Sequence, residues 1–229
     1  MSLLKSNSVQ IGQSATATQN FTLSVPSSPD GTIKLARGNS GATTADVLTV
    51  DASGNVTTTL ADGIVTPAKL SQPMTLATAQ ATTSGTAIDF TGIPSWVKRI
   101  TVMFDGVSTN GTSVIQVQVG SGSFTTSEYS CVGSTVGASS VASVQYTSGF
   151  GFGDSFNTAT RTKNGSIQIS NVSSNIWSSF GGLADSSSAR TDFTSGVISI
   201  SGTLDRVRIT TVNGTDTFDA GSVNILYEG

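Results

Sequence analysis

Short runs in which apolar residues occupy every second position recur along most of this 229-residue chain, and turn residues separate them. Residues 100–104 and 115–119 show the pattern most clearly, with branched or aromatic side chains at alternate positions. Residues two apart lie on the same face of a β-strand, so this period predicts strands with one face in a core. The pattern therefore favours a β-rich fold.

The composition agrees with this prediction. Only 11% of the residues are charged, whereas roughly a quarter is usual in globular domains. Serine, threonine, asparagine and glycine compete with the helical backbone or cost it entropy, while valine, isoleucine and threonine suit a pleated sheet. Long exposed helices are not expected, and the chain is predicted to be all-β with many turns.

The net charge, the first residues and the lack of a long apolar run limit which partners and which cellular location we expect. The formal net charge is −3, which gives no field to hold nucleic-acid phosphates or an anionic bilayer. The first residues lack the apolar core of a secretory signal, and no apolar run approaches the roughly 20 residues of a membrane span. Synthesis in the cytoplasm is expected, without nucleic-acid binding or membrane insertion.

Histidine is absent, and Cys131 is the single cysteine. The chain thus lacks the commonest general base and metal ligand, and it cannot form an intrachain disulfide. No spacing of its acids marks a catalytic pair of the kind that glycoside hydrolysis requires. We therefore expect a protein that is not an enzyme, with no catalytic residue, bound metal or cofactor.

The N-terminal segment, residues 1–58, has signals for short strands. Residues 21–25 and 33–35 alternate on either side of a Pro-Asp-Gly turn, which predicts a β-hairpin. Residues 47–50 and Val56 flank a second turn. The apolar content is thin for an independent fold, so we expect this segment to bury its apolar side chains at an interface.

A different pattern marks residues 59–84, which we interpret as a short connector. Residues 66–70 begin with a capping threonine and a proline, and they predict one helical turn. Such a short helix is marginal alone, so contacts between copies are its natural support. Leu60, Ile64 and Leu70 are the residues expected to face the axis between copies.

Residues 85–229 contain at least six predicted strands, with turns every 8–12 residues. The Asn164-Gly165 pair, between two short alternating runs, predicts a hairpin. This spacing favours an antiparallel β-sandwich, jelly-roll-like, as the C-terminal domain.

Several segments at both ends of the chain resemble bacteriophage tail-fibre proteins. They are residues 2–5, 9–14, 20–23 and 31–38 near the N-terminus, and residues 90–100 and 214–228 in the C-terminal domain. The N-terminal segments are similar to the attachment end of such fibres, and the C-terminal segments to the domain at their tip. Residues 121–188 match no motif of the family.

The resemblance implies a homotrimer located in the virion tail. Its N-terminal segment would bind a tail or baseplate protein, and its C-terminal tip domain would bind a glycan or protein of the host surface. The chain has almost no shaft, so it resembles a short side fibre or adaptor as much as a long fibre.

Aromatic and cationic residues in the C-terminal domain are candidates for receptor contact. Aromatic faces stack on sugar rings, and a mixed aromatic and cationic patch suits recognition. The candidates are Trp177, Tyr129, Tyr146, Arg161, Lys163 and Arg190. The alternatives are strand packing for Trp177 and scattered surface positions for the rest.

Two other functions stay open. The chain is alternatively a capsid decoration or baseplate structural protein that binds only other virion proteins, or, less favoured, a glycan depolymerase. A turn near Asn213, Asp216 and Asp219 has oxygen ligands suitable for calcium, but side chains that satisfy their own turn explain it more simply.

Overall fold

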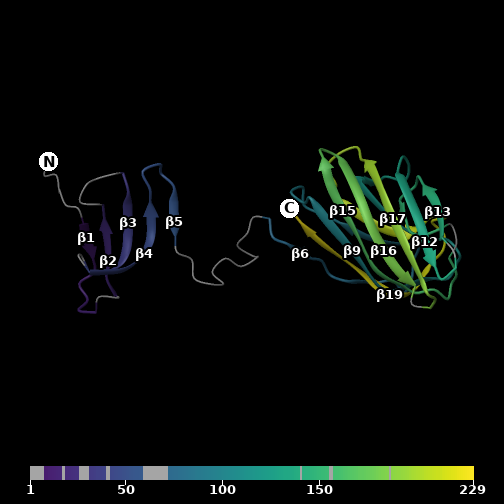
Figure 1. The fold of residues 1–229 in the computed structure, drawn as a ribbon, viewed down its shortest axis with the longest axis horizontal. Coiled ribbons are helices and arrows are strands. Elements are labelled where there is room, and N and C mark those ends of the chain that lie inside the picture. Colours follow the sequence, from purple (N-terminus) through teal and green to yellow (C-terminus); the bar gives the residue numbers. More distant parts are fainter. Residues whose placement is uncertain are drawn as a thin grey trace. The chain divides into compact units, whose positions relative to one another are not determined.

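The computed structural model describes residues 8–16, 19–25, 31–39, 42–58, 72–139, 141–154, 157–185 and 187–229. The chain divides into two compact units, Met1–Thr66 and Pro67–Gly229, both drawn in Figure 1. Within the described ranges the regular elements are all strands, so the all-β prediction is confirmed. The predicted helical turn and its axis candidates Leu60, Ile64 and Leu70 lie in residues 59–71, outside the described residues. No described helix has the length and apolar character needed to cross a membrane.

The N-terminal unit is one antiparallel sheet in which the strands follow chain order. The strands are β1 (Ser8–Ile11), β2 (Phe21–Ser24), β3 (Ile33–Asn39), β4 (Ala42–Val50) and β5 (Val56–Thr58). The predicted pairings of β2 with β3 and of β4 with β5 are confirmed. Asp51 closes the second turn, because its Oδ1 accepts hydrogen bonds from the backbone N–H groups of Ser53 and Asn55, both at 2.9 Å.

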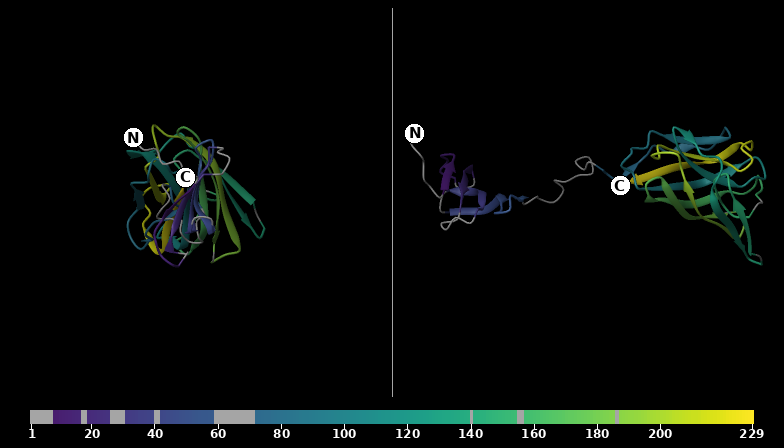
Figure 2. Two further views of the ribbon diagram at one scale, coloured as in Figure 1. Left: turned by 90° about the vertical axis from the view of Figure 1, so that its left-hand side faces the viewer. Right: turned by 90° about the horizontal axis from the view of Figure 1, so that it is seen from above.

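The C-terminal unit contains two antiparallel sheets, seen from further directions in Figure 2. The small sheet has the order β11-β10-β18-β8, with β14 beside β10, and the large sheet has the order β13-β12-β17-β16-β15-β9-β19-β6, with β7 beside β19. The strands of the small sheet are β8 (Ala87–Thr91), β10 (Ile115–Ser121), β11 (Ser123–Phe124), β14 (Phe150–Gly151) and β18 (Arg206–Thr211). Those of the large sheet are β6 (Thr75–Leu76), β7 (Gln80–Ala81), β9 (Arg99–Thr109), β12 (Ser130–Gly137), β13 (Val141–Tyr146), β15 (Lys163–Ser173), β16 (Ile176–Asp185), β17 (Arg190–Ser199) and β19 (Phe218–Glu228).

One hydrophobic core joins the two sheets. The alternating residues of β9 and β10 enter it as predicted, and Val102, Val117 and Val119 have no exposed surface. Ile209 of the small sheet and Ile167 of the large sheet belong to the same buried cluster. Because strand side chains alternate between faces, each sheet also presents a second face away from this core.

The large sheet extends further toward the N-terminus than the expected boundary at residue 85. The short strands β6 and β7 lie in the stretch interpreted as connector, and both pair with β19. Thr82 is fully buried, and its hydroxyl donates a hydrogen bond to the carbonyl of Ala220 at 2.7 Å. Residues 75–82 are therefore part of the C-terminal unit.

The hairpin predicted at Asn164-Gly165 is wrong. Both residues lie inside β15, where the pairing with β9 shifts register between Lys163 and Gly165. A Cβ on Gly165 would lie 2.3 Å from the carbonyl oxygen of Gly182, so glycine permits a close backbone approach at this bulge. Asn164 accepts a hydrogen bond from the N–H of Gly106 at 2.8 Å. A turn motif thus serves as a β-bulge.

Candidate functional site

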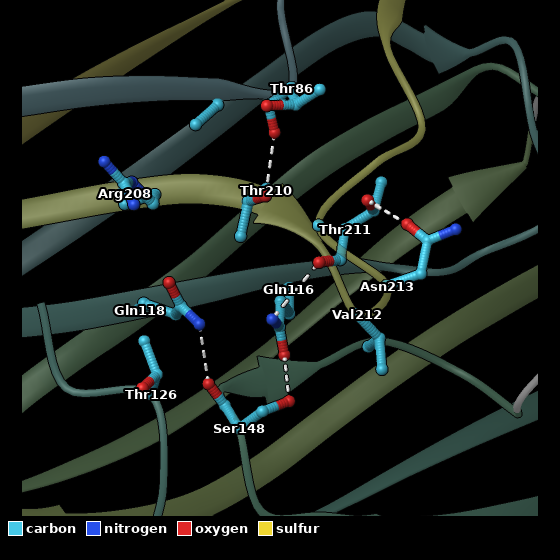
Figure 3. Close-up of a pocket in the computed structure, with 12 residues that line it drawn as sticks. Thr86, Gln116, Gln118, Thr126, Ser148, Arg208, Thr210, Thr211, Val212 and Asn213 are labelled. Carbon is cyan, nitrogen blue, oxygen red and sulfur yellow. Dashed lines mark hydrogen bonds between the residues drawn. The ribbon is translucent and has the colours of Figure 1, made fainter.

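A pocket of about 350 Å³ lies on the face of the small sheet that points away from the core (Figure 3). Register places Gln116 opposite Thr210, and Gln118 opposite Arg208, so these four side chains share that face. Loops near residues 126, 148 and 213 form the rim. The lining residues are Thr86, Ala87, Gln116, Gln118, Thr126, Ser148, Arg208, Thr210, Thr211, Val212, Asn213 and Gly214.

The two glutamines of β10 form the floor of this groove, and Ser148 holds both. The Ser148 hydroxyl donates to Gln116 Oε1 at 2.9 Å, and Gln118 Nε2 donates to the Ser148 carbonyl at 2.8 Å. Gly149 leaves room for this arrangement, because a Cβ there would lie 2.7 Å from Gln116 Oε1. The floor is thus a fixed polar surface.

The side-chain carbonyl oxygen of Gln118 accepts no hydrogen bond from its described neighbours. The residue is only 5% exposed, and among its described contacts only the amide nitrogen makes a hydrogen bond. Figure 3 shows the carbonyl oxygen turned away from Ser148, toward the strand that carries Arg208. This oxygen is not one of the fully buried unpaired atoms of the described residues, so it is open to the groove and can accept a hydrogen bond from a ligand or water.

Arg208 forms a rigid wall of the groove. Its guanidinium donates two hydrogen bonds to the Asp89 carboxylate, at 2.7 and 2.8 Å, and it stacks 4.0 Å from the centre of the Phe124 ring. The hydrogen bond to Asp89 is the main cause that raises the pKa of Arg208 above its ordinary value. The side chain is thereby held charged and in one orientation.

Side-chain hydrogen bonds fix the segments around the groove. Thr210 donates to the Thr86 carbonyl at 2.7 Å. Asn213 Oδ1 accepts from the N–H groups of Thr215 and Asp216, at 3.0 and 3.2 Å, which agrees with the turn interpretation of this segment. No group of three or more potential metal-binding side chains occurs among the described residues.

The chemistry of the groove suits binding of a neutral, hydroxyl-rich molecule. Amides and hydroxyls donate and accept hydrogen bonds in a fixed geometry, while the charge of Arg208 is balanced by Asp89. The lining contains no carboxylate. The Ser148 hydroxyl donates to an amide oxygen, and a neutral amide is not a base that can activate a nucleophile. As described, the groove can bind and orient a ligand.

Three receptor-contact candidates are instead part of the core. Tyr129, Tyr146 and Trp177 are 2%, 5% and 3% exposed, so in this structure their side chains pack inside the C-terminal unit and present little surface to a receptor. The two tyrosine hydroxyls serve internal hydrogen bonds: Val119 N–H donates to Tyr129 at 2.9 Å, and Tyr146 donates to the Asp154 carbonyl at 3.0 Å. Burial is the main cause that raises the pKa of both phenols.

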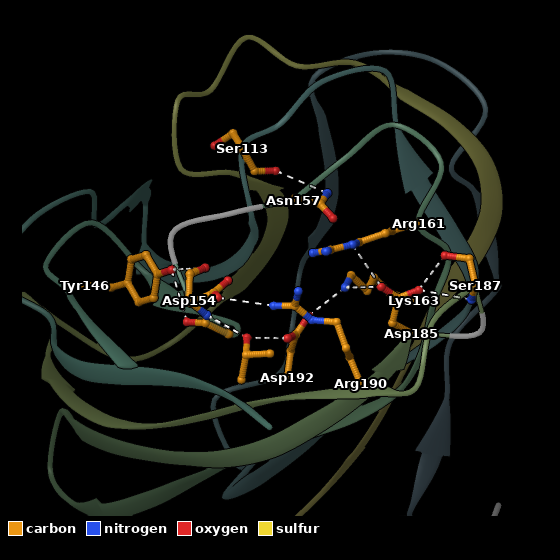
Figure 4. A network of polar contacts seen from close by, with 12 residues as sticks. Ser113, Tyr146, Asp154, Asn157, Arg161, Lys163, Asp185, Ser187, Arg190 and Asp192 are labelled. Atoms are coloured by element: carbon orange, nitrogen blue, oxygen red, sulfur yellow. Dashed lines mark hydrogen bonds and ion pairs between the residues drawn. The ribbon is translucent and has the colours of Figure 1, made fainter. Parts of the chain in front are cut away.

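The other three candidates, Arg161, Lys163 and Arg190, do come together (Figure 4). Each pairs with carboxylates inside the C-terminal unit rather than forming an open cationic patch. The ion pairs are Lys163–Asp192 at 2.6 Å, Lys163–Asp185 at 3.6 Å, Arg161–Asp185 at 3.2 Å and Arg190–Asp154 at 3.2 Å. We call these six residues the charge network.

The centre of the charge network is buried, although Arg190 Nε has no hydrogen-bond partner among the described residues. The Asp185 side chain has no exposed surface, and that of Lys163 is 6% exposed. Burial by itself would raise the pKa of Asp185, but hydrogen bonds from Ser187 and Ser188 and the charge of Lys163 together lower it. Thr135 donates to Asp192 at 2.6 Å. The network ties the ends of β15, β16 and β17 together, so its role is structural.

A second surface covers the outer face of the large sheet, on β12, β13, β16 and β17. Seven apolar side chains on this face are at least one-third exposed: Val132, Val136, Val141, Ile176, Phe180, Phe193 and Val197. Register places them among serine, threonine, glycine and glutamine, without a charged residue at the outward positions of these strands between the strand ends. We call it the uncharged face.

Sequence reasoning did not identify the groove. The alternation in residues 115–119 predicts only that Gln116 and Gln118 share the polar face of a strand, and no sequence pattern singles out Arg208. The signal that was available is the alternation of two glutamines with core valines. It does not reveal that β18 and two distant loops enclose them.

Comparisons with known proteins found no match: no family model, no curated protein and no solved structure is similar enough to this chain to assign a relative.

Proposed function

We propose that this protein is a tail fibre of a bacteriophage, a structural component of the virion that attaches to the host surface. In this proposal the N-terminal segment binds a tail or baseplate protein, three copies form the fibre, and the C-terminal unit is a jelly-roll-like β-sandwich at the tip. The all-β fold and the resemblance of the terminal segments support it.

The groove is the observation that carries the binding function. It combines a fixed polar floor, an accessible acceptor oxygen on Gln118 and an Arg208 held by Asp89. These groups match the alternating donors and acceptors of a glycan, which we propose as the ligand class. An open groove of this kind supports weak binding, and three sites on one fibre compensate by raising the effective concentration.

We propose that this protein is not an enzyme. A glycan depolymerase requires a pair of positioned carboxylates at the scissile bond, whereas the groove lining has none. The carboxylates of the charge network are engaged with Lys163 and two arginines. We therefore place glycan binding ahead of glycan cleavage.

Binding of the labelled full chain to a panel of bacterial strains tests the proposal. We expect adhesion to at least one strain, and an at least tenfold loss of affinity in Gln118→Ala. Gln168→Ala is the matched control, because it removes a glutamine exposed on the large sheet. Competition by polysaccharide from the bound strain identifies the ligand. Adhesion that is equal in both variants would exclude the groove, and failure to bind any bacterial surface would count against host attachment.

The uncharged face favours a second candidate function, that of a structural protein binding only other virion proteins. Exposed apolar side chains without charges are typical of the centre of protein interfaces. Phe180, which is 67% exposed, lies on this face. If Phe180→Lys prevents incorporation into virions while groove variants neither bind cells nor alter infection, the structural role is the correct one.

A further inference from the structure

Three side chains form a row across the small sheet, on the face that carries the groove. Register places Gln118 of β10 opposite Arg208 of β18, and Arg208 opposite Asp89 of β8. Directly opposed residues point to the same side of a sheet, with Cβ atoms about 5 Å apart. Gln118 and Arg208 line the groove, whereas Asp89 is not part of its lining. The row therefore places an amide, a cation and an anion side by side in that order.

The amide of Gln118 makes the first end of the row a hydrogen-bond acceptor. Its Nε2 donates to the Ser148 carbonyl at 2.8 Å. A carbonyl can only accept, so the opposite orientation of the amide would set two acceptor oxygens against each other. The side-chain oxygen of Gln118 therefore points away from Ser148, toward the strand that carries Arg208 (Figure 3). A ligand group that meets this oxygen must be a donor.

The carboxylate of Asp89 occupies one edge of the Arg208 guanidinium. Its two oxygens accept hydrogen bonds from Nε and Nη2, at 2.7 and 2.8 Å. Two parallel bonds of this kind are the geometry in which a guanidinium recognises a carboxylate. Among the described residues, Nη1 of Arg208 has no hydrogen-bond acceptor. The side chain can therefore still donate to an oxygen atom in the groove while Asp89 holds its other edge.

Asp89 also balances the positive charge that the groove would otherwise have. Among the described residues that line the groove, Arg208 is the only charged one. The other cation of β18, Arg206, lies outside the lining and is held by Asp205 through bonds of 2.7 and 3.1 Å. An anion seated beside Arg208 would thus meet the carboxylate of Asp89 within about 8 Å, the distance over which physiological salt screens charges.

We infer that Asp89 is a specificity-determining residue of the groove, which makes the groove select neutral glycans and reject acidic ones. The inference rests on the proposed glycan binding and narrows its ligand class. A sugar hydroxyl both donates and accepts, so it can donate to the Gln118 oxygen and accept from Arg208. A carboxylate only accepts, so it would face the Gln118 oxygen and a guanidinium whose charge Asp89 already balances. Asp89 acts by positioning and neutralising Arg208.

Removing the charge of Asp89 should reverse this preference. In Asp89→Asn the charge of Arg208 is no longer balanced, and the edge formed by Nε and Nη2 becomes available to a carboxylate of the ligand. The side chains of Arg208 and Asp89 are 31% and 36% exposed. Ion pairs this exposed contribute little to folding, so the variant is expected to fold as the wild type does.

Binding of the full chain to polygalacturonate and to its methyl ester is the test, because the two polymers share one sugar and linkage and differ in charge. We expect the wild type to bind the ester at least tenfold more tightly than the acid. Asp89→Asn should gain at least tenfold in affinity for the acid, and this gain should disappear in about 0.5 M sodium chloride. Asp89→Glu, which restores the carboxylate, should keep the wild-type preference.

Asp205→Asn is the matched control, because it removes the same charge from the pair with Arg206, outside the groove lining. An equal gain in both variants would assign the effect to net charge and overturn the inference. Tight binding of the acid by the wild type, or no binding of it by Asp89→Asn, would overturn it as well. Adhesion to bacteria reports separately on the proposed function. A chain that adheres through Gln118 but shows no effect of Asp89→Asn keeps its glycan site and loses only this inference, whereas a chain that adheres to no strain contradicts glycan binding itself.

Discussion

At the scale of single residues, environment decides what the polar side chains of the C-terminal unit do. Lys163 and Gln118 both occupy strand positions and are both 5% exposed. Lys163 is held by the carboxylates of Asp192 and Asp185, whereas Gln118 keeps one acceptor free in the groove. A buried charge held by opposite charges indicates a structural residue, while an acceptor that is open to a groove indicates a binding residue.

We expect that removing Lys163 from the charge network greatly lowers the free energy of unfolding. Lys163→Met leaves the buried carboxylate of Asp192 without its nearest cation, and we expect a loss of about 3–5 kcal/mol in unfolding free energy. Urea denaturation followed by fluorescence measures it. Adding Asp192→Asn should restore much of the loss, because no uncompensated charge then remains at that position. If Lys163→Met loses less than about 1 kcal/mol of unfolding free energy, as an exposed ion pair would, the network contributes little to stability.

We expect that replacing Gly149 displaces Gln116 and destabilises the groove. A methyl group in Gly149→Ala would displace the Gln116 amide, break its hydrogen bond with Ser148 and destabilise the unit by about 1–3 kcal/mol. Thermal unfolding measures the change. In a Gln116→Ala background the same substitution should cost less, because the two closest atoms belong to the Gln116 side chain and only the Val117 carbonyl oxygen, at 3.1 Å, remains. Equal costs in both backgrounds would mean that the clash is with the backbone instead.

At the scale of elements, the bulge and the charge network lie at strand ends, whereas the floor of the groove lies inside β10 and β18. The Asn164-Gly165 bulge lies near the start of β15, and the charge network joins that start to the end of β16 and to β17. Regular pairing fixes the middle of each strand. At the strand ends, side-chain contacts take over this role. The residues that make them, such as Asn164 and Arg161, are ones that sequence patterns assign to turns or to the surface.

Asp185, at the end of β16, predicts acid sensitivity. Its pKa is lowered in the folded state, so its contribution to stability is complete above the unfolded pKa of about 4 and is lost as pH falls through the lower folded pKa. Denaturation between about pH 6 and 2 should show falling stability in the acid part of the range. Asp185→Asn should be less stable at neutral pH and flatter in acid. A variant with the wild-type slope would exclude Asp185 as a source of the acid sensitivity.

At the scale of the whole molecule, the two units differ in how they are stabilised. The C-terminal unit has a core between two sheets, while the N-terminal unit is one sheet with exposed apolar side chains, among them Val9, Leu23 and Val56. The first can be stable within one chain. In the proposed trimeric fibre, contacts between chains stabilise the second.

This difference predicts two unfolding transitions with distinct concentration dependence. Both tryptophans and all three tyrosines lie in the C-terminal unit, so intrinsic fluorescence follows that unit alone, while far-UV circular dichroism follows both. A tenfold rise in protein concentration should raise the midpoint of the N-terminal transition by a few degrees and leave the fluorescence midpoint unchanged. Midpoints that both stay constant would show that the N-terminal sheet is stable without other copies.

The groove and the charge network were beyond prediction from sequence for the same reason. Alternation reveals which residues share a face of one strand, but it does not reveal which strands become neighbours. Gln118 and Arg208 are 90 positions apart in the sequence and pair only through the register of β10 with β18. Tyr129 and Tyr146 are buried because their hydroxyls bond to backbone groups of Val119 and Asp154, contacts that the sequence does not reveal.

By itself the sequence determined the all-β class and several strands with their faces, such as residues 100–104 and 115–119, because a period of two in apolar residues depends only on local backbone geometry. The tertiary structure decided the rest: that Trp177 is buried, that Arg161, Lys163 and Arg190 meet carboxylates, and that an Asn-Gly pair forms a bulge. These depend on strand order and register, which are set by contacts between residues far apart in the chain.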